Sequence, residues 1–280
     1  MPFISYDDCL KRLRAQIKAN KPIIGAGAGT GISAKFAEKG GVDLIIIYNS
    51  GRYRMAGRGS LAGLMPYGDA NAIVTEMAAE VLPVVKDTPV LAGVCGTDPF
   101  RMMRVFLPQL KEMGFDGVQN FPTVGLIDGN FRAQLEETGM GIQLEVDMIA
   151  KAHELEMLTC PYVFDADTAT RFTQAGADVV VAHVNTTTGG SIGVSQSAMP
   201  LDEAVQRVQA MHDAAKKANP NVIVLCHGGP IATPEDAQYV LSKTRGVAGF
   251  FGASSIERLA TESAIEAQAR AFKALKLGPS

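Results

Sequence analysis

Residues 177–197 read ADVVVAHVNTTTGGSIGVSQS, which is the pattern of a buried strand followed by a long polar loop. Val179–Val184 is apolar and rich in β-branched residues, as expected of a parallel strand that is covered on both faces. The loop from Asn185 then leads to a helical pattern over Pro200–Ala218. Strand, loop and helix in this order make one βα unit, and the same unit recurs along the chain.

Short apolar runs of this kind predict eight strands, at Pro22–Ala26, Leu44–Tyr48, Val90–Val94, Gly117–Phe121, Met157–Phe164, Val179–Val184, Val222–Cys226 and Val247–Phe251. Helical patterns fill the gaps, at Ser33–Glu38, Asn71–Val85, Phe100–Met113, Phe131–Glu137, Thr168–Ala175, Pro200–Ala218, Pro234–Leu241 and Thr261–Lys276. Eight βα units in 280 residues predict an α/β fold, a single (β/α)8 TIM barrel, for which about 250 residues are typical. An open, doubly wound sheet is the alternative.

A further helix, Tyr6–Ala19, precedes the first strand and carries Leu10, Leu13 and Ile17 on one face. We expect residues 1–20 to cover the bottom of the barrel. No linker or low-complexity segment interrupts the pattern, so residues 1–280 are expected to form one domain.

The composition argues against several classes of partner. With 26 Lys and Arg against 29 Asp and Glu, the chain lacks the basic face that nucleic-acid binding needs. It has no apolar span of membrane length and no signal-peptide pattern at its start.

Four cysteines without a C-x-x-C pair fit buried thiols in a reducing cytoplasm. A catalytic thiol at Cys226 is the alternative, but its neighbour His227 should point to the opposite face of the strand.

The first strand ends in the glycine-rich stretch Gly25–Gly31, which matches neither G-x-G-x-x-G nor a P-loop. No nucleotide cofactor is therefore expected. Gly27 could let an anion approach the backbone, or the stretch could be a tight turn.

The second strand is followed by Asn49 and by three arginines among glycines: Arg52, Arg54 and Arg58. Guanidinium groups can hold a carboxylate or phosphate through two hydrogen bonds. We expect one or two of them to face a pocket, and the alternative is a solvated basic loop.

Polar residues also follow the third and fourth strands. Asp98 is a catalytic candidate or the cap of the next helix, and Asn120 is a candidate for substrate binding. Glu145 lies among apolar residues, so burial would raise its pKa and suit it for acid–base work. An ordinary solvent-facing position is the alternative.

His183 and His227 stand at the ends of the sixth and seventh strands, which converge on the mouth of a barrel. They are expected to act as general acid and base. They could instead bind a divalent metal, Mg or Zn, with Glu145, Asp98 or Asp165, although no H-x-H or H-E-x-x-H spacing supports one.

Small residues in the last loops predict an anion site. The glycines and hydroxyls after strands seven and eight match the common phosphate site of barrels, and they are Gly228, Gly229, Gly252, Ala253, Ser254 and Ser255. Residues 185–197 are expected to form a mobile loop over the site. Glycines would give it conformational freedom and hydroxyls would bind the anion, through Thr187, Thr188, Gly189, Gly190 and Ser191.

Five segments carry a family resemblance: IIGAGAGTGISAK (23–35), NSGRYRMAGRGSLAGLMPYGDAN (49–71), FPTVGLIDGNFR (121–132), ETGMG (137–141) and TTTGGSIG (186–193). They resemble the TIM-barrel signal-transduction family, also described as phosphoenolpyruvate-hydrolase-like or phosphonopyruvate-hydrolase-like. Enzymes of the wider phosphoenolpyruvate group use acidic magnesium ligands and a Lys- or Cys-bearing lid, of which this chain shows no obvious counterpart.

The resemblance implies an enzyme that cleaves or hydrolyses a small anion, a 2-oxo acid or phospho-acid, through an enolate-like intermediate. The alternatives are a barrel that senses a metabolite or binds a partner without turnover, and a phosphosugar isomerase. Family members fused to a second domain imply a partner protein, and pairing through barrel helices predicts a homo-oligomer.

Overall fold

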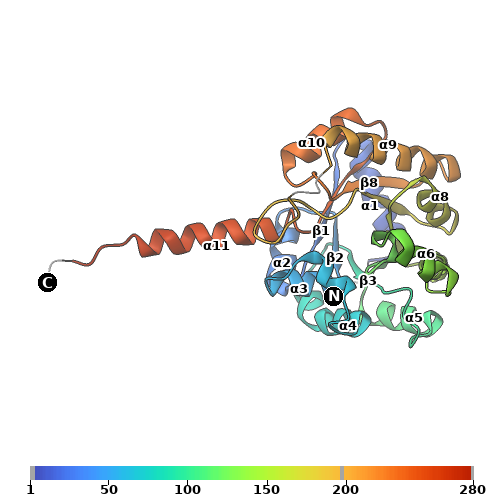
Figure 1. The fold of residues 1–280 in the computed structure, drawn as a ribbon, viewed down its shortest axis with the longest axis horizontal. Coiled ribbons are helices and arrows are strands. Elements are labelled where there is room, and N and C mark those ends of the chain that lie inside the picture. Colours follow the sequence, from blue (N-terminus) through green and yellow to red (C-terminus); the bar gives the residue numbers. More distant parts are fainter. Residues whose placement is uncertain (1–3, 196–198, 279–280) are drawn as a thin grey trace.

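The computed structural model describes residues 4–195 and 199–278, and in it a parallel sheet forms the centre of the molecule (Figure 1). The strands are β1 (Ile23–Gly27), β2 (Leu44–Ile47), β3 (Val90–Gly93), β4 (Gly117–Gln119), β5 (Leu158–Thr159), β6 (Tyr162–Val163), β7 (Val179–His183), β8 (Ile223–His227) and β9 (Gly249–Gly252). They are short and almost wholly buried, as a sheet covered on both sides requires.

The sheet closes on itself through the predicted fifth run. Its strand order is β5-β4-β3-β2-β1-β9-β8-β7-β6, so β5 and β6 are the two outermost strands. Only Cys160 and Pro161 separate them in the chain. The first half of the run pairs with β4 and the second half with β7. The predicted eight-stranded barrel is therefore confirmed, and the open sheet is ruled out.

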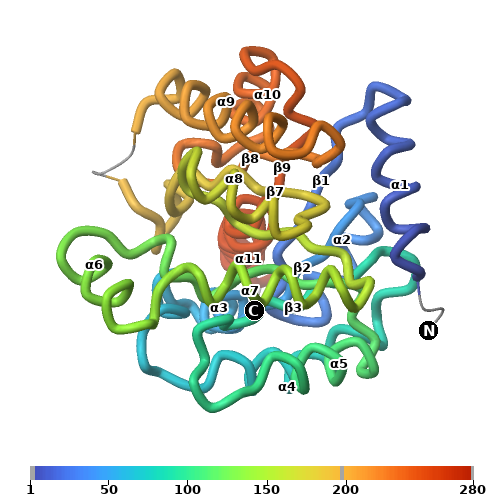
Figure 2. Tube along the Cα trace, turned by 90° about the vertical axis from the view of Figure 1, so that its right-hand side faces the viewer, coloured from blue at the N-terminus to red at the C-terminus, as the bar shows by residue number. Residues whose placement is uncertain are grey.

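Helices surround the sheet (Figures 1 and 2). Those after successive strands are α2 (Gly31–Lys39), α4 (Ala70–Val81), α5 (Met103–Met113), α6 (Gly129–Glu137), α7 (Gln143–Glu154), α8 (Ala166–Gln174), α9 (Leu201–Ala218) and α10 (Pro234–Lys243). Short 3-10 segments lie at η1 (Ser60–Leu64), η2 (Leu82–Val84) and η3 (Val124–Leu126). None of the helices in the described ranges combines the length and the apolar character needed to cross a bilayer.

Two helices, α3 and α7, lie outside the ranges predicted as helical. The segment after β2, predicted as a loop, forms α3 (Asn49–Met55). Its arginines lie on a helical period, so they cannot all face the same way. This helix decides which arginine reaches the interior.

The first helix, α1 (Tyr6–Lys18), lies across the amino ends of the strands. The Tyr6 hydroxyl donates to Asp178, which precedes β7, at 2.6 Å. Gln16 donates to Asp43, which precedes β2, at 3.0 Å. In Figure 2, α1 lies on the side opposite to α6, which leaves the carboxyl ends of the strands for the loops.

The last helix, α11 (Arg258–Lys273), leaves the barrel instead of returning along β9 (Figure 1). Residues 263–278 are exposed throughout, including Ile265 and Phe272. The sequence predicted a helix here but gave no indication of its direction.

Candidate functional site

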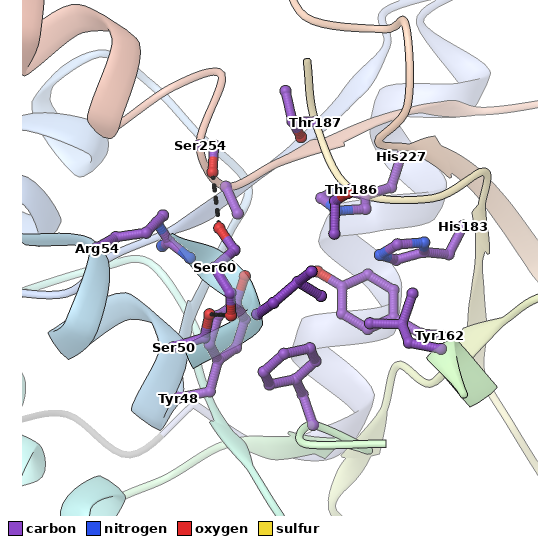
Figure 3. A pocket seen from close by; sticks show the side chains of 14 residues that line it. Tyr48, Ser50, Arg54, Ser60, Tyr162, His183, Thr186, Thr187, His227 and Ser254 are labelled. Carbon is purple, nitrogen blue, oxygen red and sulfur yellow. Dashed lines mark hydrogen bonds between the residues drawn. The ribbon is translucent and has the colours of Figure 1, made fainter. Parts of the chain in front are cut away.

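The carboxyl ends of the strands enclose a small cavity of about 30 Å³ at the mouth of the barrel (Figure 3). Its wall is built by α3, η1, η3, β6, β7, β8 and the segments that follow β2, β4, β7 and β9. The lining residues are Tyr48, Ser50, Arg54, Ser60, Leu61, Phe121, Leu126, Tyr162, His183, Thr186, Thr187, His227, Ala253 and Ser254. Hydroxyl groups, two imidazoles and one guanidinium lie in this wall among aromatic and aliphatic side chains. A space of this size admits water, so a larger ligand requires side chains or loops to move.

The strand register brings His183 and His227 together. These two residues are paired across β7 and β8, so both side chains point to the same face of the sheet. Their ring centroids lie 4.6 Å apart, and each residue is 5% exposed. The predicted convergence of the two histidines on one cavity is what the structure shows.

The hydrogen bonds assign opposite tautomers to the two imidazoles. His183 Nδ1 accepts the backbone N–H of Asn185 at 3.1 Å, so the proton of the neutral ring sits on Nε2. His227 Nδ1 faces the carbonyl oxygen of Phe251 and must donate to it, which leaves the lone pair on Nε2. One ring therefore offers a donor through Nε2, and the other offers an acceptor.

Both imidazoles are neutral near pH 7. Burial lowers the pKa of His183 well below its usual value, and the nearby His227 adds to the effect. Burial also lowers the pKa of His227, to about 4, against the opposing influence of the Phe251 carbonyl. The cavity thus holds a potential base rather than two cations.

Arg54 is the one of the three predicted arginines that lines the cavity, and it is 3% exposed. Its Nη2 donates to Glu257 Oε2 at 2.9 Å, and its guanidinium lies 5.4 Å from the centre of the Tyr48 ring. Glu257 also accepts from the Gly29 N–H and the Ser33 hydroxyl. The guanidinium is therefore fixed before any ligand arrives.

The other two arginines lie elsewhere. Arg52 is 3.6 Å from Glu80 near the surface, and Arg58 is exposed. Gly27 lies beside the cavity wall, where a Cβ would come within 2.9 Å of the Ala253 Cβ. Asn49 is buried and donates to the Gly63 carbonyl at 2.9 Å, so it holds η1 in place.

Glu145 is fully buried, as one reading of the sequence required, but it does not line the cavity. It accepts from Asn120 and Thr123, each at 2.7 Å, and from the Val124 N–H at 2.8 Å. Burial raises its pKa to about 7 against these hydrogen bonds. The side chain of Asn120 is also fully used within the protein, because its Oδ1 accepts the Tyr162 N–H while its Nδ2 donates to Glu145. Both residues shape the loop after β4.

Asp98 lies in a separate groove of about 530 Å³, on the outer side of η1 and η3. It accepts from Asn71 and from the Phe100 N–H, each at 2.9 Å, and pairs with Arg101. It does not cap α5, whose N-cap is Met102. Asp98 is therefore remote from the two histidines.

Only some residues of the predicted phosphate site line the cavity. Gly228 and Gly229 pack against the segment after β7: a Cβ on either would lie within 2.4 Å of a carbonyl oxygen, and the Gly229 N–H donates to Asn185 O at 2.7 Å. Ala253 and Ser254 do line the cavity, and Ser254 Oγ is 3.1 Å from Ser60 Oγ. The phosphosugar isomerase alternative relied on this whole site, of which Ala253 and Ser254 line the cavity.

The remaining members of that site also lie outside the wall. Gly252 ends β9, and the Ser255 hydroxyl is buried with no hydrogen-bond partner among the described residues.

The segment after β7, described over residues 184–195 and called the β7 loop below, reaches the cavity through Thr186 and Thr187. The Thr188 N–H donates to Gly229 O at 3.1 Å. Gly189, Gly190 and Ser191 lie farther along, against α11. Gln196 and Ser197, which belong to the expected mobile loop, lie outside the described residues.

Two tyrosines in the cavity wall, Tyr48 and Tyr162, were not predicted from the sequence. Tyr162 is fully buried, and its ring lies 4.8 Å from His183 and 4.9 Å from His227. Its hydroxyl points into the cavity and has no hydrogen-bond partner within residues 4–195 and 199–278. Tyr48 ends the second predicted strand, where its position at a carboxyl end was the available signal.

The fold and the cavity define a class of protein: a (β/α)8 barrel with a small cavity at the carboxyl ends of its strands, into which two imidazoles and one guanidinium point. Solved barrels share the architecture. The phosphoenolpyruvate phosphomutase of Streptomyces platensis subsp. rosaceus is similar with a TM-score of 0.60 at 16% identity, covering 94% of this chain and 86% of the other. A phosphonopyruvate hydrolase in complex with oxalate and Mg++ gives 0.57 at 17% identity, covering 95% and 87%. At such identities the likeness shows the fold.

The chain belongs to the phosphoenolpyruvate hydrolase-like family, whose model matches residues 8–275. The resemblance drawn from its motifs is thereby confirmed. The ToMV susceptible protein tm-1(GCR26) of Solanum lycopersicum is 64% identical over 268 residues, which are 96% of this chain and 35% of the tomato protein. The chain thus spans about a third of the length of that relative.

The cavity does not fit a divalent metal. Mg²⁺ prefers carboxylate oxygens, whereas Glu145 and Asp98 are hydrogen-bonded elsewhere and Asp165 caps α8. Two imidazoles fall short of the three protein ligands of a catalytic zinc. Within the described ranges, no group of three or more His, Cys, Asp or Glu side chains is placed to hold a metal ion.

Proposed function

We propose that the protein is a cytoplasmic enzyme that binds a small anion, a 2-oxo acid or phospho-acid, at the barrel mouth and cleaves or hydrolyses it. The observation that carries the proposal is the pair of opposite tautomers at His183 and His227, beside the fixed guanidinium of Arg54. A donor and an acceptor in one small cavity, next to a cation, suit chemistry in which an enolate forms.

The anionic group of the substrate would be held by Arg54 together with the hydroxyls of Ser60, Ser254 and Thr187. Glu257 uses one guanidinium nitrogen, so further N–H donors remain for a ligand. Because Arg54 is already fixed by Glu257 and Tyr48, binding would cost little side-chain entropy.

The two imidazoles would divide the proton transfers. His227 Nε2 carries the lone pair and would accept the proton of a water that attacks the phosphorus of a phosphonopyruvate-like substrate. The P–C bond breaks, its electron pair passes into the enolate, and the protonated imidazole returns the proton to the enolate carbon. His183 Nε2–H and the Tyr162 hydroxyl would donate to the oxygen on which the enolate charge develops. An anionic ligand also favours the protonated imidazole, so substrate binding should raise the pKa of His227 toward neutrality.

The test is pyruvate formation from phosphonopyruvate, phosphoenolpyruvate and oxaloacetate, for the wild type and for His227→Gln and His183→Gln. We expect one of the three substrates to be turned over and each variant to lose about 100-fold or more in kcat. An Arg52→Gln variant is the matched control, because that arginine lies outside the cavity. Turnover of none of the substrates would overturn the proposal.

A barrel that binds a metabolite or a partner protein without turnover is the second candidate, and the nearly filled barrel mouth favours it. Calorimetry with oxalate and with inorganic phosphate distinguishes the two functions. Binding that needs Arg54, without turnover of any of the three substrates, would favour the sensor.

We also propose that the protein associates with a second copy of itself through α11. Its exposed Ile265 and Phe272 need a partner surface, and α2, near the base of α11, carries exposed Ile32 and Phe36. In a closed two-fold dimer, α11 of each copy would pack against α2 of the other copy. A further partner protein is a separate proposal, since the tomato relative is much longer than this chain.

A further inference from the structure

The base of α11 contacts the β7 loop. Arg258, the first residue of the helix, is 4% exposed, and its Nη2 donates to the Gly189 carbonyl at 3.0 Å. Its Nη1 lies 3.1 Å from Glu262 Oε1, one turn farther along. A buried guanidinium at the start of the helix therefore holds the backbone of the loop.

Glu262 makes the second half of the contact. Its Oε2 accepts the Ser191 N–H at 3.0 Å, and its Oε1 accepts the Ser191 hydroxyl at 2.7 Å. One carboxylate thus binds two donors of the same residue. The acceptor is charged, which strengthens both bonds, and together they hold the exposed Ser191 against α11.

The glycines of the loop fit this contact. Gly190 has φ +74°, and a Cβ there would lie 2.2 Å from Arg258 Nη1 and 2.5 Å from Glu262 Oε2. The neighbouring Gly189 also has a positive φ, of 80°. No larger residue could replace Gly190 without displacing the ion pair, so this glycine serves close approach as well as flexibility.

The same loop reaches the cavity only a few residues earlier, through Thr186 and Thr187. Asn185, the second residue of the loop, donates its N–H to His183. An isolated bridge between Thr188 and Val194 closes the tip on itself. A displacement at Ser191 would therefore be passed to the cavity wall along a short, internally bonded segment.

We propose that Arg258 and Glu262 are positioning residues that anchor the β7 loop, so that the order of the loop and the affinity of the cavity for anions depend on α11. The affinity part rests on the proposed function. Because the rest of α11 is free of the barrel, a partner that binds this helix would act on the cavity through the same two residues.

The test compares full-length wild type with Glu262→Ala by hydrogen exchange over residues 186–195 and by calorimetry with oxalate. We expect exchange to become about tenfold faster or more, because two charge-assisted hydrogen bonds are lost. Oxalate binding should weaken several-fold. Ser191→Ala should give a smaller effect, and Glu262→Gln, which keeps one acceptor, should restore part of the protection.

Glu266→Ala is the matched control, since Glu266 lies one turn farther along α11 and pairs with Arg270. It should change neither exchange nor affinity. Unchanged exchange in Glu262→Ala would overturn the anchor, and faster exchange with unchanged oxalate affinity would overturn its link to the cavity. If the wild type binds no oxalate, the proposed ligand class fails, whereas the exchange result still decides the anchor.

Discussion

At the scale of single residues, the environment of each ionisable group decides what it can do. His183 and His227 are kept neutral by burial and are oriented by one backbone hydrogen bond each. Glu145, equally buried, is surrounded by three donors and does not line the cavity. The histidines are therefore available for proton transfer, while the carboxylate maintains the loop after β4.

The histidines should make stability depend on pH. Their pKa values in the folded protein lie below the ordinary 6.5, so the unfolded chain takes up protons that the folded chain excludes. Stability should therefore fall as the pH is lowered from about 6.5 toward 4, by up to about 3 kcal/mol for His227.

Urea unfolding at several pH values between 7 and 4.5 measures this effect. His227→Gln removes one of the two groups, so its stability should decline less steeply with acidification than that of the wild type. Parallel curves would show that the pKa of His227 is the same in the folded and unfolded protein, which would contradict the lowered pKa.

Glu145→Gln should destabilise the protein by about 2 kcal/mol, because an amide nitrogen would then face hydrogen-bond donors in a buried site. The measurement is the free energy of unfolding in urea. Glu154→Gln, at the exposed end of the same helix, is the control. Equal stability of the two variants would mean that the donors around Glu145 find other partners.

At the scale of elements, the register of β7 and β8 places the histidines, and the loops after the strands complete the cavity. The β7 loop has contacts of two kinds: its first residues line the cavity, and its tip rests on α11. Helix α3 has a similar role on the other side, where it turns Arg54 inward and leaves Arg52 near the surface.

Binding of an anion should order the β7 loop further. Thr186 and Thr187 would gain a hydrogen-bond acceptor, so amide exchange across residues 185–195 should slow when oxalate or phosphate is bound. Exchange with and without ligand, with binding checked by calorimetry, measures this. A loop whose exchange stays the same in the saturated protein would be a static wall.

At the scale of the whole molecule, one continuous hydrophobic core fills the barrel and the layer beneath its helices. This supports the proposal that the chain is a single domain. Helix α11 is the exception, because it leaves the barrel with its apolar residues uncovered (Figure 1). A lone helix of this length gains little stability by itself, which is a further reason to expect a second copy against it.

We expect a dimer rather than a 29.6 kDa monomer in light scattering after gel filtration. Replacing Phe272 and Leu275 by Asp should yield monomers, because both are exposed apolar residues near the end of the chain. The barrel should remain folded, as shown by an unchanged near-ultraviolet circular dichroism spectrum. A wild type that is monomeric at micromolar concentration would contradict the proposal.

The amino-acid sequence by itself determined the barrel and the meeting of the two histidines. Strand and helix periods are local properties, and parallel strands bring their carboxyl ends to one side whatever the details. It also indicated that Glu145 could be buried, from the apolar residues around it. The family followed from long motifs, which need no three-dimensional information.

Only the tertiary structure decided which polar groups face the cavity. Residue type alone could not separate Arg54 from Arg52 and Arg58, because their directions depend on α3 and on the distant Glu257. The glycines at 228 and 229 suggested an anion site, yet they make room for the β7 loop. The sequence also contained no signal that α11 would extend away from the barrel. Each of these outcomes depends on contacts between residues far apart in the chain, which no local pattern records.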